Sequence, residues 1–180
     1  KTIKELIESH IKNENFATVL TAYLKDPTGY GRIVRDEEGN LEKIVEHKDA
    51  NEKEKNIKEI NSGIYCFKGR ELKYALNKID DDNAQGELYI TDVISILKQE
   101  GYRVGAYLIE DATEIYGVNS RVQLAFCEKI MRERINRYHM ENGVTIIDPY
   151  NTYIEAEVKI GRDTIIYPGA ILKGKTTIGN

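Results

Sequence analysis

Three polar side chains stand at the ends or breaks of apolar stretches, where they can meet a ligand. Glu46 ends a stretch in which apolar residues give way to charged ones, Asn61 interrupts another together with Gly63, and Asn119 follows Gly117. An ionised Glu accepts hydrogen bonds on two oxygens, so Glu46 can accept them from sugar hydroxyls. A side-chain amide carbonyl suits a hard cation, so Asn119 is a candidate Mg²⁺ ligand.

Each of these residues also has a plainer interpretation. A charged strand end such as Glu46 is usually a solvated edge, and Asn119 taken alone is more often a turn residue before a helix. An isolated glycine in a strand, as at Gly63, marks a bulge or the close approach of another group. The functional interpretation therefore depends on whether these residues come together.

The elements that must position them alternate between helices and strands. The Thr2 and Glu5 capping-box spacing, with apolar residues three and four apart, predicts a helix over residues 2–12. Residues 17–24 are typical of a buried strand in a largely parallel sheet. The other elements expected before residue 119 are hairpin strands (32–35, 41–46), a polar connection (51–58), a strand (60–67), a helix (70–79), a polar loop (80–87), a helix (88–100) and a strand (104–109). This order indicates α/β layering.

The pattern changes after residue 119. Ser120 and Gln123 have capping-box spacing, and apolar residues from Leu124 to Tyr138 recur at three and four, which predicts a long helix ending near Gly143. Beyond it, apolar anchors recur every six residues, at Ile154, Ile160, Ile166, Leu172 and Ile178. A fixed short period of this kind predicts a β-helix, whose last coil needs further coils to cover it.

Composition excludes several classes of function. The 180 residues are 41% hydrophobic and 31% charged with a formal charge of −4, so we expect a globular cytoplasmic protein that binds neither nucleic acid nor membrane. Cys66 and Cys127 lie in apolar contexts and are expected to be buried thiols. The three histidines are scattered without metal-ligand spacing.

Five motifs in order carry a family resemblance. They are DPTGYGRIVRD, IVEHKDA, EINSGIY, NAQGELYITDVI and GVNSRVQL, followed by the six-residue repeat. Over essentially the whole chain they resemble the bacterial bifunctional N-acetylglucosamine-1-phosphate uridyltransferase and glucosamine-1-phosphate acetyltransferase family. The resemblance implies part of a Rossmann-like nucleotide-diphospho-sugar transferase lobe (1–119), a linker helix (120–143) and the first coils of a left-handed β-helix (144–180).

The resemblance also implies an activity and partners. Members of that family make UDP-N-acetylglucosamine from UTP and N-acetylglucosamine 1-phosphate with Mg²⁺, and acetylate glucosamine 1-phosphate with acetyl-CoA in a β-helix that forms a homotrimer. The uridyl transfer is an in-line displacement that needs positioning and charge neutralisation rather than a protein nucleophile. This agrees with the absence of any Ser/His/Asp or Cys/His constellation in the sequence.

The family's site residues carry over to matching positions. By this resemblance Gly31 contacts the sugar nucleotide through its backbone, Glu46 binds the sugar hydroxyls, Asn61 lies beside the sugar and Asn119 is a metal ligand. The family's pocket-wall motif matches a second set, whose members could instead cap the following helix. That set is Glu87, Tyr89 and Thr91.

The sequence departs from the family at both ends. The family's nucleotide loop and metal-sharing aspartate are expected before Lys1, and its acetyltransferase histidine and CoA-binding residues beyond Asn180, so we expect a piece that is inactive by itself. His139 is not that histidine on this reading. Two other interpretations stay open: another sugar-1-phosphate nucleotidyltransferase with a β-helix tail, and a non-catalytic regulatory subunit of the same fold.

Overall fold

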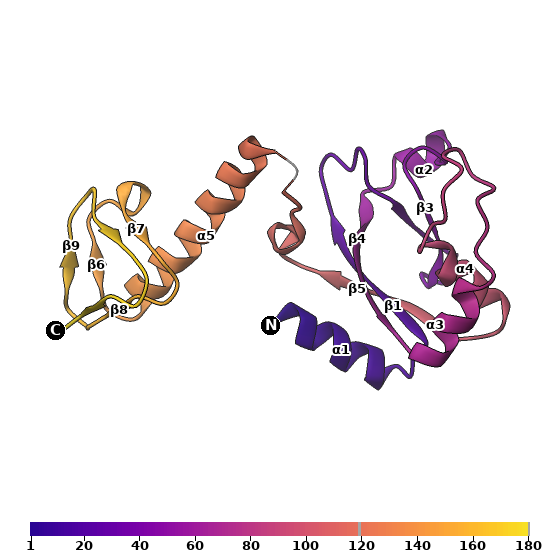
Figure 1. Ribbon diagram of the computed structural model, residues 1–180, viewed down its shortest axis with the longest axis horizontal. Coiled ribbons are helices and arrows are strands. Elements are labelled where there is room, and N and C mark those ends of the chain that lie inside the picture. Colours follow the sequence, from indigo (N-terminus) through magenta and orange to yellow (C-terminus); the bar gives the residue numbers. More distant parts are fainter. Residues whose placement is uncertain (119, 180) are drawn as a thin grey trace. The chain divides into compact units, whose positions relative to one another are not determined.

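The chain forms two compact units. The computed structural model describes residues 1–118 and 120–179, and it divides the chain into Lys1–Ile115 and Tyr116–Asn180. Figure 1 shows the sheet with its helices in the first unit, and a long helix leading into short strands in the second. The three-part division at residues 119 and 143 stays a prediction.

The first unit is built on a mixed five-stranded sheet. Three of the four strand pairs among its described strands are antiparallel, and β1 pairs in parallel with β5. The expectation of a largely parallel sheet around residues 17–24 is therefore wrong for this part of the chain. The strands, in spatial order, are β3 (Leu41–Val45), β2 (Arg32–Arg35), β4 (Glu59–Phe67), β1 (Ala17–Tyr23) and β5 (Val104–Ile109).

Helices on both faces explain why β1 resembled a parallel strand. Ala17 and Val19 pack in a core with helices α3 (Gly69–Leu76) and α4 (Asp92–Gln99), whereas Leu20 and Ala22 pack in a second core with Leu6 of helix α1 (Thr2–Lys12). Burial on both faces gives a continuous apolar run whatever the direction of the neighbouring strands. The α/β layering is confirmed.

The start of α1 differs from the expected capping box. Lys1 is the N-cap and makes no side-chain capping bond, and the Thr2 hydroxyl donates instead to the Glu114 carboxylate. The buried stripe of α1 also differs from the apolar one, because Thr2, Leu6 and His10 are buried while Ile3, Ile7 and Ile11 are exposed. The face that packs combines Leu6 with polar contacts, including His10 Nδ1 with Thr18 Oγ1 at 2.9 Å.

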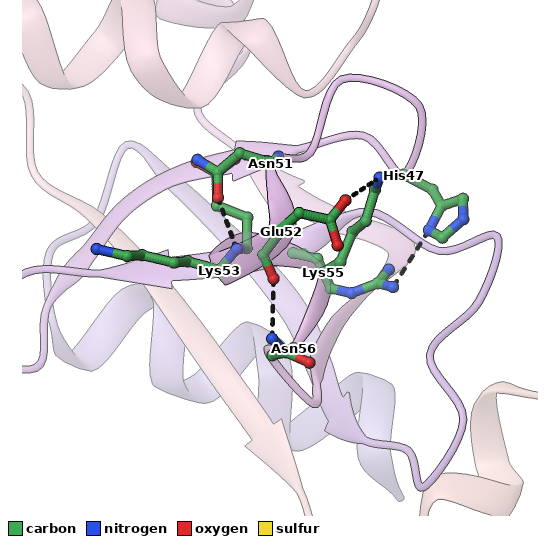
Figure 2. A network of polar contacts seen from close by, with 8 residues as sticks. His47, Asn51, Glu52, Lys53, Lys55 and Asn56 are labelled. Carbon is green, nitrogen blue, oxygen red and sulfur yellow. Dashed lines mark hydrogen bonds and ion pairs between the residues drawn. The ribbon is translucent and has the colours of Figure 1, made fainter.

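Two short features interrupt the expected elements. The polar connection over residues 51–58 contains helix α2 (Glu52–Lys55). Asn51 and Glu54 cap the start of this helix with a reciprocal capping box, and Figure 2 shows the hydrogen bond of Asn51 there. Strand β4 carries the irregularity that Gly63 predicted: the register shifts between Val19 and Thr21 of β1, and Gly63 has φ +78°. Helix α4 begins at Asp92, so the four residues expected to open it form no helix.

The second unit begins with helix α5 (Arg121–Glu141). The Ser120 hydroxyl accepts a hydrogen bond from the Gln123 amide at 3.1 Å, as the spacing predicted. The apolar side chains expected to pack are largely exposed, among them Leu124, Met131 and Tyr138, and the buried residues are Asn136 and His139. Ile135 of the expected apolar face packs against the core that follows, and the two buried polar residues supplement this contact.

Short strands follow α5 at the predicted period. Ile171 pairs with Tyr153 and Thr177 with Lys159, both in parallel, so these strands return to the same place after 18 residues, or three repeats. The first pair, Ile165 with Thr145, is also parallel but is 20 residues apart. Each of the five apolar anchors is the second residue of a two-residue strand, and these side chains share a core with Val144 and Ile146. The elements are β6 (Thr145–Ile146), the 3-10 turn η2 (Pro149–Asn151), β7 (Tyr153–Ile154), β8 (Lys159–Ile160), β9 (Ile165–Ile166), β10 (Ile171–Leu172) and β11 (Thr177–Ile178).

Two further sequence expectations concern single features. Cys66 and Cys127 are free thiols, each partly buried rather than fully so. Among the described residues, no helix combines the length and the apolar character that a membrane crossing requires. The first unit ends in the 3-10 helix η1 (Ala112–Ile115).

Candidate functional site

Gly31, Glu46 and Asn61 converge at the end of the β2–β3 hairpin. The hairpin ladder ends with Arg32 opposite Val45, so Gly31 and Glu46 are the next opposed positions. A Cβ atom at Gly31 would lie 3.2 Å from Glu46 Oε1 and 3.4 Å from Asn61 Cβ, and the backbone N–H of Asn61 donates to the Gly31 carbonyl at 2.9 Å. The structure thus brings together three of the four residues of the predicted sugar site, and only a glycine leaves room between them.

The Glu46 carboxyl lies in a partly buried, acidic environment. Burial raises the pKa of Glu46 above its usual value, and the nearby carboxylates of Asp49 and Asp92 raise it further. The Thr91 hydroxyl beside it acts in the opposite direction on the pKa. These surroundings therefore disfavour the ionised form of Glu46, and hydrogen bonds donated by a ligand would stabilise that form.

Two buried hydroxyls at this site lack a complete hydrogen bond. Tyr65 Oη and Thr91 Oγ1 are both buried and make no hydrogen bond of ordinary geometry within the part of the chain that the structure describes, although Asn61 lies close enough to Tyr65, and Thr91 to Glu46, for a side-chain interaction that lowers the pKa of Tyr65 and of Glu46. Burial raises the pKa of Tyr65, the neighbouring Asn61 side chain opposes this, and Glu46 adds to it. Buried hydroxyls whose hydrogen bonds are weak or poorly aligned are costly, so these two groups beside Glu46 can be satisfied further by a ligand.

Tyr65 is a residue that the sequence reasoning missed. Val19 and Thr21 of β1 pair with Tyr65 and Asn61 of β4. A step of two residues along β1 thus corresponds to four residues along β4, which is two more than in a regular ladder. An excess of two preserves the alternation of side chains, so Asn61 and Tyr65 share a face of the sheet. The even spacing of Asn61 and Tyr65 within one strand was the sequence signal that could have placed Tyr65 beside Asn61.

The loop before α4 supplies part of the second predicted set. Tyr89 Oη accepts a hydrogen bond from Gln85 Nε2 at 2.6 Å, and its pKa is raised first by burial and then by Asp49 and Glu46. Asp49 Oδ1 in turn accepts from the Ala84 amide at 2.7 Å, which ties this loop to the end of the hairpin. Tyr89 therefore lies near the Glu46 group.

Thr91 and Glu87 differ in whether their side chains reach the group around Glu46. Thr91 is 2% exposed and is the N-cap residue of α4, but its side chain makes no capping bond, so the capping alternative is not realised. Glu87 is exposed, and its backbone is bound to Asn83. Thr91 joins the group around Glu46, whereas no contact among the described residues brings the Glu87 side chain to it.

The predicted metal ligand cannot be placed. Asn119 lies outside the described residues. Within residues 1–118 and 120–179, no three or more His, Cys, Asp or Glu side chains form a group that could hold a metal ion. The role of Asn119 as a metal ligand stays a prediction.

Comparison with known sequences identifies similar proteins. The nucleotidyl transferase family model matches residues 1–131. The chain is 58% identical over 178 residues to "Bifunctional protein GlmU" of Caldanaerobacter subterraneus subsp. tengcongensis, covering 99% of the chain and 39% of that protein. It is 57% identical over 180 residues to the protein of the same name from Clostridioides difficile, covering 100% and 39%. The chain therefore spans about two fifths of the length of these relatives, and the family resemblance of its motifs is confirmed.

A solved structure shares the fold over much of the chain. It is a putative glucose-1-phosphate thymidylyltransferase from Bacillus anthracis in complex with a sucrose, with a TM-score of 0.54 and 20% sequence identity. The match covers 74% of this chain and 50% of that one. At this level of identity it supports the α/β fold alone.

Proposed function

The chain belongs to the nucleotidyl transferase family, and from this premise we propose that it forms part of a longer enzyme that makes UDP-N-acetylglucosamine from UTP and N-acetylglucosamine 1-phosphate. The longer protein is called the full-length enzyme below. The identity of 57–58% to proteins named "Bifunctional protein GlmU" supports this choice within the family. In this proposal the 180 residues carry much of the sugar site and little of the nucleotide site.

One observation carries the proposal: Gly31, Glu46 and Asn61 meet where the hairpin ladder stops. Beyond the Arg32 and Val45 pair, the hairpin strands no longer hydrogen-bond to each other, and the site residues occupy the next positions. The missing Cβ of Gly31 leaves space beside a carboxylate and an amide. A sugar, which offers hydroxyls in several directions, matches such a mixture of acceptors and donors.

Each of the three residues has a role that follows from its chemistry. Glu46 accepts hydrogen bonds from sugar hydroxyls, because an ionised carboxylate only accepts. Asn61 Oδ1 accepts from the Gly63 backbone N–H at 2.9 Å, and its Nδ2 carries two N–H groups, so a donor beyond any contact with Tyr65 can serve an oxygen of the sugar or its N-acetyl group. Gly31 allows the ligand to approach the backbone closely. Tyr65, Tyr89 and Thr91 shape the surroundings of Glu46.

The reaction itself asks these residues for positioning. The phosphate oxygen of the sugar phosphate attacks the α-phosphorus of UTP, a new P–O bond forms, and the bond to the leaving pyrophosphate breaks. By fixing the sugar, the chain's residues orient the attacking oxygen, which lowers the entropic part of the barrier. A bound Mg²⁺ would neutralise phosphate charge, and Asn119 is proposed as one of its ligands.

The second unit is proposed to begin a left-handed β-helix. The return of the chain after 18 residues and the shared core of the five anchors support this reading. We propose that in the full-length enzyme this β-helix forms a homotrimer, acetylates glucosamine 1-phosphate with acetyl-CoA, and works in the cytoplasm. Helix α5 then links the two activities.

The test measures UTP-dependent pyrophosphate release by the full-length enzyme with two sugar phosphates. The proposal predicts release with N-acetylglucosamine 1-phosphate and much less with glucose 1-phosphate. Preference for another sugar phosphate or another nucleotide would support the alternative nucleotidyltransferase. Binding of UDP-N-acetylglucosamine without any turnover would instead support a regulatory subunit, and either result would overturn the assignment.

A further inference from the structure

Arg32 is a buried arginine with an unusual set of partners. Its side chain is 1% exposed, Nη1 donates to the Tyr30 carbonyl, and Nη2 lies 3.2 Å from His47 Nδ1. Its Nε has no hydrogen-bond partner among the described residues. Burying a guanidinium is costly, so its partners should show what it is retained for.

No carboxylate forms an ion pair with Arg32 within the described part of the chain. Burial lowers the pKa of Arg32, and Asp26 is near enough only to offset part of this effect. A buried Arg that served fold stability alone would be expected to have a paired charge, and even the exposed Arg35 of the same strand has one in Glu59. The two neutral partners of Arg32 therefore point to a different role.

The position of these partners in the chain is the key observation. Tyr30 immediately precedes Gly31, and His47 immediately follows Glu46. Because the β2–β3 ladder ends with Arg32 opposite Val45, backbone pairing between these strands does not extend to Gly31 and Glu46. The Arg32 side chain hydrogen-bonds to Tyr30 and His47. It thereby links the two segments at the point where their backbone pairing has ended.

The hydrogen bond to His47 fixes the state of the imidazole. A guanidinium only donates, so His47 Nδ1 must be the acceptor, with the ring proton on Nε2. Figure 2 shows the His47 ring with its bond drawn at the ring nitrogen. The planar fork of Arg32 reaches two acceptors in different segments at once, which a lysine ammonium on its flexible stem cannot do with the same geometry.

We propose that Arg32 is a positioning residue for the sugar site, and that it holds Gly31 and Glu46 in place through the Tyr30 carbonyl and His47 Nδ1. This inference rests on the proposed function. Arg32 contacts no substrate in this role. It acts on the spacing between the turn that carries Gly31 and the strand end that carries Glu46, and so on the affinity for the sugar phosphate.

The test compares Michaelis constants of variants of the full-length enzyme. Arg32→Lys removes the fork that makes both links, and His47→Phe removes one of them. Misplacement of the site should raise KM for N-acetylglucosamine 1-phosphate by about tenfold or more while KM for UTP stays within about twofold. His47→Asn should restore a KM near that of the parent, because its amide oxygen lies as many bonds from the backbone as Nδ1. Rescue by an acceptor is a result that a purely structural role does not predict.

Arg35→Lys is the matched control. Arg35 lies in the same strand and makes a bidentate ion pair with the buried Glu59, with Nε–Oε2 at 2.8 Å and Nη2–Oε1 at 2.7 Å. Its replacement should lower the melting temperature and leave both Michaelis constants unchanged. If Arg32→Lys cannot be purified in folded form, the two His47 variants decide, since His47 is only partly buried.

Several results would overturn the proposal. Unchanged sugar-phosphate KM in His47→Phe, an equal rise in both Michaelis constants, or equal losses in His47→Asn and His47→Phe would each do so. Glu46→Gln separates this failure from failure of the proposed function. If Glu46→Gln raises the sugar-phosphate KM and the Arg32 and His47 variants do not, only the positioning role is wrong; if Glu46→Gln has no effect, the site itself is wrong.

Discussion

A Cβ atom at Gly31 would lie 3.2 Å from Oε1 of Glu46. The contact is closer than side chains ordinarily tolerate, so the absence of a side chain at residue 31 sets where the Glu46 carboxylate can lie. Gly31 has no left-handed backbone, and an alanine here would meet Glu46, Ile44 and Asn61 rather than backbone strain. This relationship joins the turn and the hairpin end into one site.

Gly31→Ala should therefore impair binding more than folding. We expect the methyl group to displace Glu46 and to weaken binding of UDP-N-acetylglucosamine by about tenfold, with a loss of folding stability below about 1.5 kcal/mol. Calorimetric titration of the full-length enzyme measures the first and thermal unfolding the second. Gly69→Ala is the control, because Gly69 lies in open space at the start of α3 and should leave both quantities nearly unchanged.

Glu46→Gln should not destabilise the chain at neutral pH. Burial raises the folded-state pKa of Glu46 above its unfolded value, so ionised Glu46 disfavours the folded state. That penalty is present at neutral pH and disappears as pH falls below the unfolded pKa, where the carboxyl is protonated in both states. Because Glu46 remains half exposed to solvent, we expect a gain of less than about 1 kcal/mol at pH 7.5.

Urea unfolding of the 180-residue chain at pH 7.5 and in acid checks this sign. The difference between Glu46→Gln and the parent should shrink as the pH falls through the raised pKa. A Glu46→Gln chain that is clearly less stable at pH 7.5 would show that ionised Glu46 stabilises the fold, in contradiction to its surroundings of Asp49 and Asp92.

Gly63→Ala should destabilise the first unit. Gly63 has φ +78° at the irregularity of β4, and an L side chain in this conformation costs about 1–2 kcal/mol. Urea unfolding measures the loss, with Gly69→Ala again as a glycine of ordinary φ in open space. Equal stabilities of the two variants would mean that β4 can take up another conformation at residue 63.

Asn136 should be critical for the attachment of α5 to the residues that follow it. It is fully buried, and its Nδ2 donates to the carbonyls of Pro149 at 2.8 Å and Thr152 at 3.0 Å. Asn136→Ala leaves both carbonyls without this donor and should cost about 1–3 kcal/mol, and Asn136→Asp, which cannot donate when ionised, should cost at least as much.

Hydrogen exchange of the second unit in the full-length enzyme measures the effect of these Asn136 variants. Faster exchange over α5 and β7 is expected, and the exposed Arg137, replaced by Ala, is the control that should exchange as the parent does. If Asn136→Ala exchanges no faster than Arg137→Ala, the apolar contacts of Ile135 with the core hold the helix by themselves.

The sequence predicted what local spacing determines. The hairpin around residues 36–40, the bulge glycine Gly63 and the six-residue anchors are each encoded by neighbours in the chain, and each is found in the structure. The convergence of Gly31, Glu46 and Asn61 was also predictable, but through the family resemblance rather than through spacing.

What the sequence reasoning missed depends on partners distant in the chain. The buried face of α5 is set by Asn136, whose acceptors lie 13 and 16 residues later, and apolar periodicity cannot detect such an attachment. Similarly, Thr2 bonds to Glu114 instead of capping its own helix. Asn51 and Glu54 had the spacing of a capping box, yet their polar surroundings resembled a simple loop.

The central claim is that Glu46 binds the sugar in the uridyl transfer reaction. The most direct measurement is KM for N-acetylglucosamine 1-phosphate in the full-length enzyme and its Glu46→Gln variant, with KM for UTP and the acetyl transfer rate recorded on the same preparations. We predict a rise of about tenfold or more in the sugar-phosphate KM, since loss of a charged hydrogen-bond partner costs about 1.5–3 kcal/mol, with the other two values within about twofold. An unchanged sugar-phosphate KM would contradict the account.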